Sequence, residues 1–119
     1  MADYEDFTID QGADVAIELH LQEQDGSKKD LTGHSALAKM KRSYNSTDSD
    51  EITSFTTIVA SPATDGILTL ALTNSQTDTL NSRLRYVYDV ELSYQDSNSQ
   101  TIIERILEGK IKVTPSVTR

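Results

Sequence analysis

The chain has 119 residues and a formal net charge of −8, from 19 acidic and 11 basic side chains, and it contains no cysteine. This length accommodates one domain, and the absence of cysteine excludes disulfides, thiolate nucleophiles and zinc–thiolate sites. The acidic balance repels phosphate backbones at long range, so we expect no nucleic-acid partner.

The N-terminal part of the chain predicts a loose lead-in and then two strands. Met1 to Asp6 is acidic and polar, and Phe7 to Asp10 alternates as a short edge strand. Val15 to Leu21 has apolar residues at every second position, which is typical of a strand with one buried face. The dipeptide Asp25-Gly26 predicts the turn that follows.

The next segment contains conflicting signals. Ser35 to Tyr44 is rich in Ala, Leu, Lys and Met, which favour helix, but its alternation of apolar and polar residues favours a strand, and we predict a strand. Asn45 to Asp50 has no apolar residue and predicts an exposed loop. The β-branched stretch Ile52 to Ala60 predicts a fourth strand, which ends at Ser61-Pro62.

The stretch after Asp65-Gly66 predicts a fifth strand and a crossover between sheets. Ile67 to Thr73 is apolar on both faces. The polar stretch Thr73 to Ser82 can form one helical turn with Thr73 as its N-cap and Leu80 as its only large apolar group.

The last third of the chain predicts the central strand and its partner. In Arg83 to Tyr94, every second residue from Tyr86 to Tyr94 is apolar or aromatic, including Leu92. Thr101 to Glu108 and Lys110 to Thr114 form the final strand, in which Gly109 marks a bulge or a close approach of another backbone segment. Pro115 ends it.

Seven short strands at turn intervals of roughly ten residues predict an all-β fold, an immunoglobulin-like antiparallel β-sandwich. We expect a single domain over 1–119, with flexible tails at 1–6 and 115–119. Immunoglobulin-like sandwiches often carry a tyrosine corner, in which a Tyr hydroxyl turns back onto the preceding loop. Tyr86 is the candidate for this corner, and Tyr88 takes the role if the register shifts by two. The alternative is that both are ordinary half-buried strand residues.

No group of residues predicts a catalytic, cofactor-binding or metal site. His20 and His34 form no HxH or HxxxH pair, so we expect both to be solvated. The acidic loop Asp48, Asp50 and Glu51 offers oxygen ligands that could hold Ca²⁺ but lacks the glycine and the distal glutamate of a calcium loop, so a solvated run of charges is favoured over ion binding there.

Catalytic alternatives are equally weak, and we expect no enzyme activity. There is no GxSxG elbow and no phosphate-binding glycine loop. Glu91, Glu104 and Glu108 lie on strand faces, where their simplest role is solubility; only their separation in space would test them as paired acids for glycoside cleavage.

Basic residues gather on two predicted neighbouring strands. The third strand carries Lys39, Lys41 and Arg42, and the start of the sixth carries Arg83 and Arg85. They form either a basic stripe for an acidic partner or cross-strand pairs with the domain's own carboxylates, and we favour the pairs.

Five blocks in order resemble a family of small bacteriophage virion proteins: FTIDQGADVAIEL, DGSKKDLTGHSALAKMKR, GILTLALTNSQTDTL, YVYDVELSY and ILEGKIKVTPSVTR. They are similar to the N-terminal immunoglobulin-like domain of the upper baseplate protein of tailed phages, over residues 7–119. The family's glycine before the YxYD-like strand and its DG turn before the last strand are replaced by Ser82 to Arg85 and by Asn98-Ser99.

The resemblance implies a non-enzymatic structural protein of a tail or baseplate, which is an adaptor present in many copies. Its implied partners are other virion proteins and further copies of itself, and its implied location is the virion, after synthesis in the host cytoplasm. We expect no membrane partner, since no apolar run approaches bilayer length. A capsid decoration or neck protein is the alternative within this class, and a carbohydrate-binding module, with Tyr44 or Tyr94 as aromatic platform, is the alternative outside it.

Overall fold

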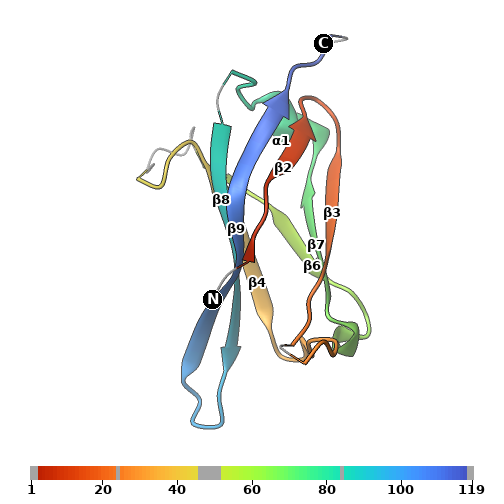
Figure 1. The fold of residues 1–119 in the computed structure, drawn as a ribbon, viewed down its shortest axis with the longest axis vertical. Coiled ribbons are helices and arrows are strands. Elements are labelled where there is room, and N and C mark those ends of the chain that lie inside the picture. Colours follow the sequence, from red (N-terminus) through yellow and green to blue (C-terminus); the bar gives the residue numbers. More distant parts are fainter. Residues whose placement is uncertain (1–2, 24, 46–51, 84, 118–119) are drawn as a thin grey trace.

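The computed structural model describes residues 3–23, 25–45, 52–83 and 85–117, which form two sheets packed face to face (Figure 1). The larger sheet has the strand order β1-β9-β8-β4-β5, and β2 also pairs with β9. Its strands are β1 (Asp3–Tyr4), β2 (Phe7–Asp10), β4 (Ser35–Lys41), β5 (Ile52–Ser54), β8 (Arg85–Gln95) and β9 (Thr101–Thr114). The smaller sheet has the order β3-β7-β6, from β3 (Val15–His20), β6 (Thr56–Val59) and β7 (Ile67–Leu72).

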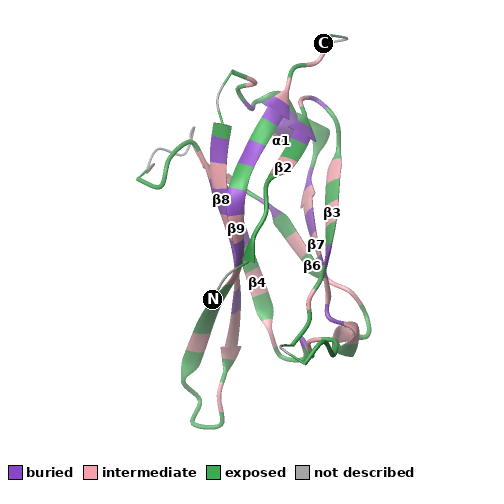
Figure 2. Ribbon diagram, in the orientation of Figure 1, coloured by how far each residue is buried: buried purple, intermediate pink, exposed green. Residues whose placement is uncertain are grey.

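The core lies between the sheets and follows the alternation of the sequence (Figure 2). In β8, Tyr86, Tyr88, Val90 and Leu92 are buried, and the residues between them are half-buried. In β4, Ala38 and Met40 are buried, so the alternation prevails over helix propensity and the predicted strand is confirmed. The sheet context decides here, because a strand buries these residues against β8 and its neighbours.

The crossover from β7 to β8 contains the predicted helix N-cap and the predicted tyrosine corner. Thr73 caps the short helix α1 (Asn74–Asp78) in a capping box with Gln76, as predicted. The Tyr86 hydroxyl accepts a hydrogen bond from the Asn81 backbone N–H at 2.9 Å, so Tyr86 forms the tyrosine corner. The hydroxyl of Tyr88 instead donates to the carbonyl oxygen of Glu5.

One predicted strand is wrong. Ile52 to Ala60 is not continuous: the chain leaves the larger sheet after Ser54 and enters the smaller sheet at Thr56. Phe55 lies between the two strands and is buried in the core, and its N–H donates to the Ala38 carbonyl at 2.9 Å. Burial of this aromatic ring places the sheet switch where local propensity predicts uninterrupted strand.

The N-terminal segment also differs from the expected loose lead-in, at least from Asp3 onward. Asp3 and Tyr4 pair with β9, the Glu5 N–H donates to the Glu108 carbonyl at 2.8 Å, and Asp6 accepts from the Lys110 N–H at 2.9 Å. Both β1 and β2 run parallel to β9, so the expectation of a wholly antiparallel sandwich is wrong at this edge. With β1 added and the fourth strand divided, the seven predicted strands become nine within the described residues.

Gly109 marks a close approach and not the bulge. The register between β8 and β9 shifts between Val90 and Glu91, which leaves Ile106 as the extra residue of β9. A Cβ at Gly109 would overlap the Glu5 carbonyl oxygen and lie 3.1 Å from Tyr88 Cε1. The glycine therefore lets the N-terminal segment cross closely over β9.

At the other terminus, the Ser116 N–H donates to the Gln11 side chain at 3.4 Å and Val117 is exposed. None of the described helices has the length and apolar character needed to cross a membrane.

Candidate interaction surface

The outer face of the larger sheet carries the most distinctive chemistry of the molecule. The register of β1, β2, β4, β8 and β9 places six of the chain's 11 Lys and Arg residues on this face: Lys39, Lys41, Arg85, Arg105, Lys110 and Lys112. Four carboxylates of these strands share it: Asp10, Asp89, Glu91 and Glu108. The strands of this face thus carry a net charge of +2 in a chain whose net charge is −8.

The cations concentrate at one end of the face. Arg85 lies opposite Lys112, and Val87 lies between Lys110 on one neighbouring strand and Lys41 on the other. We call Arg85, Lys41, Lys110 and Lys112 the cation group. None of the four has an ion pair with another described residue, although the Asp6 carboxylate lies beside the Lys110 backbone.

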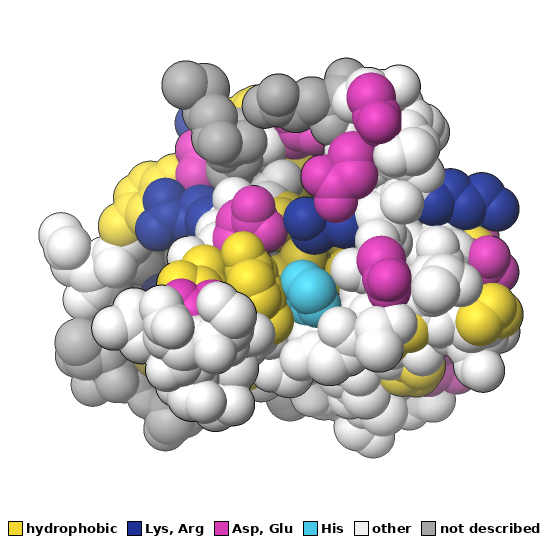
Figure 3. All heavy atoms as spheres, turned by 90° about the horizontal axis from the view of Figure 1, so that it is seen from below, with side chains coloured by type: hydrophobic (Ala, Val, Ile, Leu, Met, Phe, Trp, Pro, Cys, Tyr) yellow, Lys and Arg dark blue, Asp and Glu magenta, His cyan; other side chains and the backbone are white. Residues whose placement is uncertain are grey.

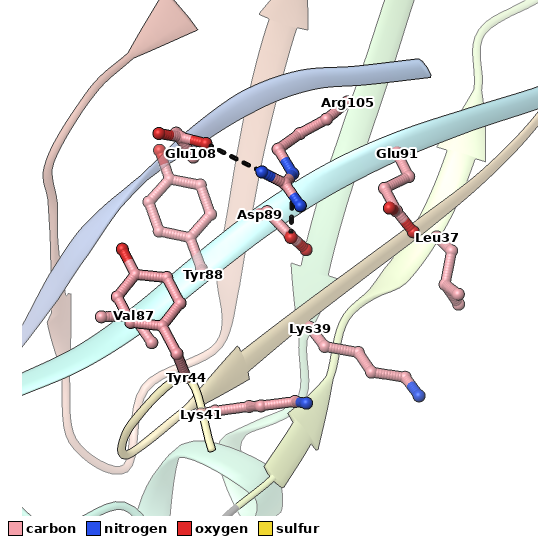
Figure 4. A pocket seen from close by; sticks show the side chains of 10 residues that line it. All are labelled: Leu37, Lys39, Lys41, Tyr44, Val87, Tyr88, Asp89, Glu91, Arg105 and Glu108. Carbon is pink, nitrogen blue, oxygen red and sulfur yellow. Dashed lines mark hydrogen bonds and ion pairs between the residues drawn. The ribbon is translucent and has the colours of Figure 1, made fainter. Parts of the chain in front are cut away.

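The carboxylates lie further along the same strands. We call Asp89, Glu91 and Glu108 the carboxylate group. Arg105 pairs with Asp89 at 3.3 Å and with Glu108 at 3.4 Å, as the close view shows (Figure 4). Lys39 lies opposite Asp89 in the register but forms no ion pair within the described residues. The prediction that the third-strand lysines pair with carboxylates across the strands is therefore wrong for the described residues. Glu91 likewise has no ion-pair partner there.

The basic stripe predicted from the sequence is therefore only partly this surface. Lys39, Lys41 and Arg85 belong to it, whereas Arg42 and Arg83 lie beyond the strand ends. Sequence reasoning missed Lys110 and Lys112, although their alternation with Ile111 and Val113 places them outward. Pairing of β9 with β8 is what brings them beside Arg85.

A hollow of about 380 Å³ lies over the middle of this face, where the carboxylate group and Lys41 line it. Figure 4 shows its lining, with Tyr44 at one side and Leu37 and Lys39 at another. Of the six large hydrophobic residues that are exposed in the described chain, four belong to this side of the larger sheet: Tyr4, Leu37, Tyr44 and Ile103. Tyr44 is 73% exposed.

A second recess lies between the sheets at the end of the molecule seen in Figure 3, where acidic, basic and hydrophobic side chains intermix. Lys29 is the organising group, because its side chain is only 17% exposed and pairs with Glu23 and Glu104, each at 3.5 Å. Nearby, hydrogen bonds from the Ser27 hydroxyl and amide lower the pKa of Asp25. The ion pairs of Lys29 tie the loop after β3 to β9.

The remaining predicted candidates are distributed over the molecule. His20 is exposed and lies 2.6 Å from Glu18, and His34 stacks on Tyr94 with ring centroids 4.4 Å apart. Glu104 faces Lys29, away from Glu91 and Glu108, so the three glutamates do not share a face. The loop Asp48, Asp50 and Glu51 lies outside the described residues. Among the described residues, no group of three His, Cys, Asp or Glu could hold a metal ion.

The strand order and the tyrosine corner define an immunoglobulin-like β-sandwich. The chain is similar in fold to the solved structure of murine CRIg, with a TM-score of 0.53 and 17% sequence identity over 92% of each chain. At this identity the likeness shows the fold alone, and it confirms the predicted fold class. No family model matches the chain, and no curated protein matches its sequence.

Proposed function

We propose that the protein is a non-enzymatic structural component of a bacteriophage particle, an adaptor of the tail or baseplate that assembles through protein–protein contacts. The five sequence blocks that resemble phage virion proteins support the phage assignment. The gathering of Tyr4, Leu37, Tyr44 and Ile103 on one side of the larger sheet supports assembly as the task, because such apolar groups on a small acidic domain mark a contact surface.

Physical chemistry also favours contact over turnover. The described carboxylates of the outer face are held by Arg105 or spread along the strands, while His20 pairs with the single carboxylate of Glu18 and His34 stacks on Tyr94. Exposed aromatic residues such as Tyr4 and Tyr44 are enriched in protein interfaces.

The test is the composition of purified particles. Mass spectrometry of the phage whose genome encodes the chain should detect it in stoichiometric amounts, and labelled antibody should decorate the tail tip. Label on the capsid or at the neck would instead support the alternative, a capsid decoration or neck protein. Absence from particles in a lysate that contains the free protein would refute the proposal.

A carbohydrate-binding module is the second candidate, and one observation favours it: the exposed Tyr44 borders a hollow that also contains Glu91 and Arg105. Tyr94 does not offer a second free platform, since its ring stacks on His34. A glycan array in which binding disappears with Tyr44→Ala but persists with Tyr4→Ala would favour this function. An array without binding would leave the virion proposal in place.

A further inference from the structure

We propose that a second copy of the chain docks on the outer face of the larger sheet, in a two-fold symmetric dimer that sets the cation group of each copy against the carboxylate group of the other. This inference rests on the proposed function in taking assembly as the task, and it adds the surface and the partner.

Charge is separated along the strands of this face. In β8 the outward residues run from Arg85 through Val87 to Asp89 and Glu91, and in β9 they run from Lys112 and Lys110 to Glu108. Both strands thus change from positive to negative in the same direction. A two-fold axis that lies in the interface, perpendicular to the strands and near the middle of the face, reverses that direction in the partner and brings opposite charges together at two equivalent places.

Several charged residues of this face have no ion-pair partner among the described residues. Lys41, Lys110 and Lys112 have no ion pair with a described residue, and neither does Glu91. Arg105 and Lys39 lie among the carboxylates and reduce their net charge to −1, so the attraction is strongest between the lysines and Glu91. A lysine beside the apolar Val87 forms a stronger ion pair with a carboxylate in an interface that excludes water than with a solvent-exposed carboxylate.

The size of the face and its exposed apolar residues also favour a dimer. The six strands of this sheet contain 41 residues, which at about 4.8 Å by 3.3 Å each cover on the order of 650 Å². A stable interface buries about that area on each partner. Leu37 and Tyr44, 53% and 73% exposed, lie on opposite sides of the hollow and supply the apolar anchors that such an interface needs.

Nucleic acid fits this face less well than a second copy of the chain does. The carboxylate group on the same face repels phosphates at contact, whereas a second copy supplies cations to it; the net charge of −8 opposes both partners at long range until salt screens it. At physiological ionic strength the screening length is about 8 Å, which is shorter than the face.

The experiment is a charge exchange between two variants, followed by sedimentation at physiological salt. Variant one carries Lys110→Glu and Lys112→Glu, and variant two carries Glu91→Lys and Glu108→Lys. We expect the wild type to form dimers and each variant alone to dissociate with a dimer Kd raised at least about tenfold. An equimolar mixture should recover a heterodimer, because both contacts are then complementary.

The control is Lys28→Glu, which reverses a lysine that is 71% exposed on the loop after β3. It should dimerise like the wild type, and circular dichroism should show every variant folded. A wild type that stays monomeric up to ~1 mM, well above typical interface Kd values, would overturn the proposal. So would variants that still dimerise, a mixture that stays monomeric, or a monomeric wild type whose lysines bind heparin or poly-L-glutamate instead. All of these results are independent of the particle composition that tests the proposed function.

Discussion

Replacing Gly109 with alanine should detach the N-terminal segment from β9 without unfolding the sandwich. The new Cβ would overlap the Glu5 carbonyl oxygen, lie 2.7 Å from the Glu5 carbonyl carbon and 3.1 Å from Tyr88 Cε1. A backbone carbonyl cannot rotate away as a flexible side chain would, so the segment from Asp3 to Asp6 must move.

The cost follows from the contacts that this movement breaks. The Glu5 N–H loses the Glu108 carbonyl, the Lys110 N–H loses Asp6, and the Tyr88 hydroxyl loses the Glu5 carbonyl. Three hydrogen bonds at about 1 kcal/mol each give about 3 kcal/mol. Replacing a strand glycine by alanine returns about 0.5–1 kcal/mol. The net loss in free energy of unfolding is about 2 kcal/mol, which corresponds to a fall in Tm of about 8 °C.

Two measurements check this expectation. Urea unfolding reports the loss of stability, and hydrogen exchange reports whether the Glu5 amide loses protection while the Val90 amide in β8 keeps it. Gly33→Ala is the comparison variant, since Gly33 has open space around its Cβ position and a φ of +76°, so that it tests backbone strain without a clash. An unchanged midpoint together with a protected Glu5 amide in Gly109→Ala would refute the close-approach argument.

Four further outcomes are expected. Tyr86→Phe removes the acceptor of the Asn81 N–H and should cost about 1–2 kcal/mol in urea unfolding; no loss would contradict a stabilising tyrosine corner. Leu92→Asp places an unpaired charge at a fully buried position and should abolish the folded circular dichroism spectrum, whereas an unchanged melt would contradict the assigned inner face. Thr73→Ala removes the N-cap of α1 and should cost about 1 kcal/mol by thermal unfolding, and an equal or higher Tm would argue against the cap. Burial, followed by nearby acidic groups, raises the pKa of Tyr88 above 10.0; the folded state therefore holds this proton more tightly, so its stabilising effect is complete below pH 10.0 and declines as the pH rises toward the folded pKa. A tyrosinate absorbance titration should show that Tyr88→Phe removes the last tyrosine to ionise, and persistence of that last step in the variant would contradict the assignment.

The sequence by itself determined most of the sandwich. Alternation in 15–20, 35–41 and 85–95 assigned both the strands and their buried faces, because a strand exposes every second side chain to the same environment. Thr73 and Tyr86 were found from local rules, since a cap and a tyrosine corner depend on partners only a few residues away.

Only the tertiary structure decided features that depend on distant partners. Phe55 divides a stretch of uniformly high β propensity because the core between the sheets receives its ring, and Glu5 and Asp6 are ordered by Gly109 and Lys110, more than a hundred residues away. The interaction surface belongs to the same category. Lys41, Arg85 and Lys110 become neighbours only through strand pairing, and the charge pattern of a sheet face is set by register, which no single strand contains.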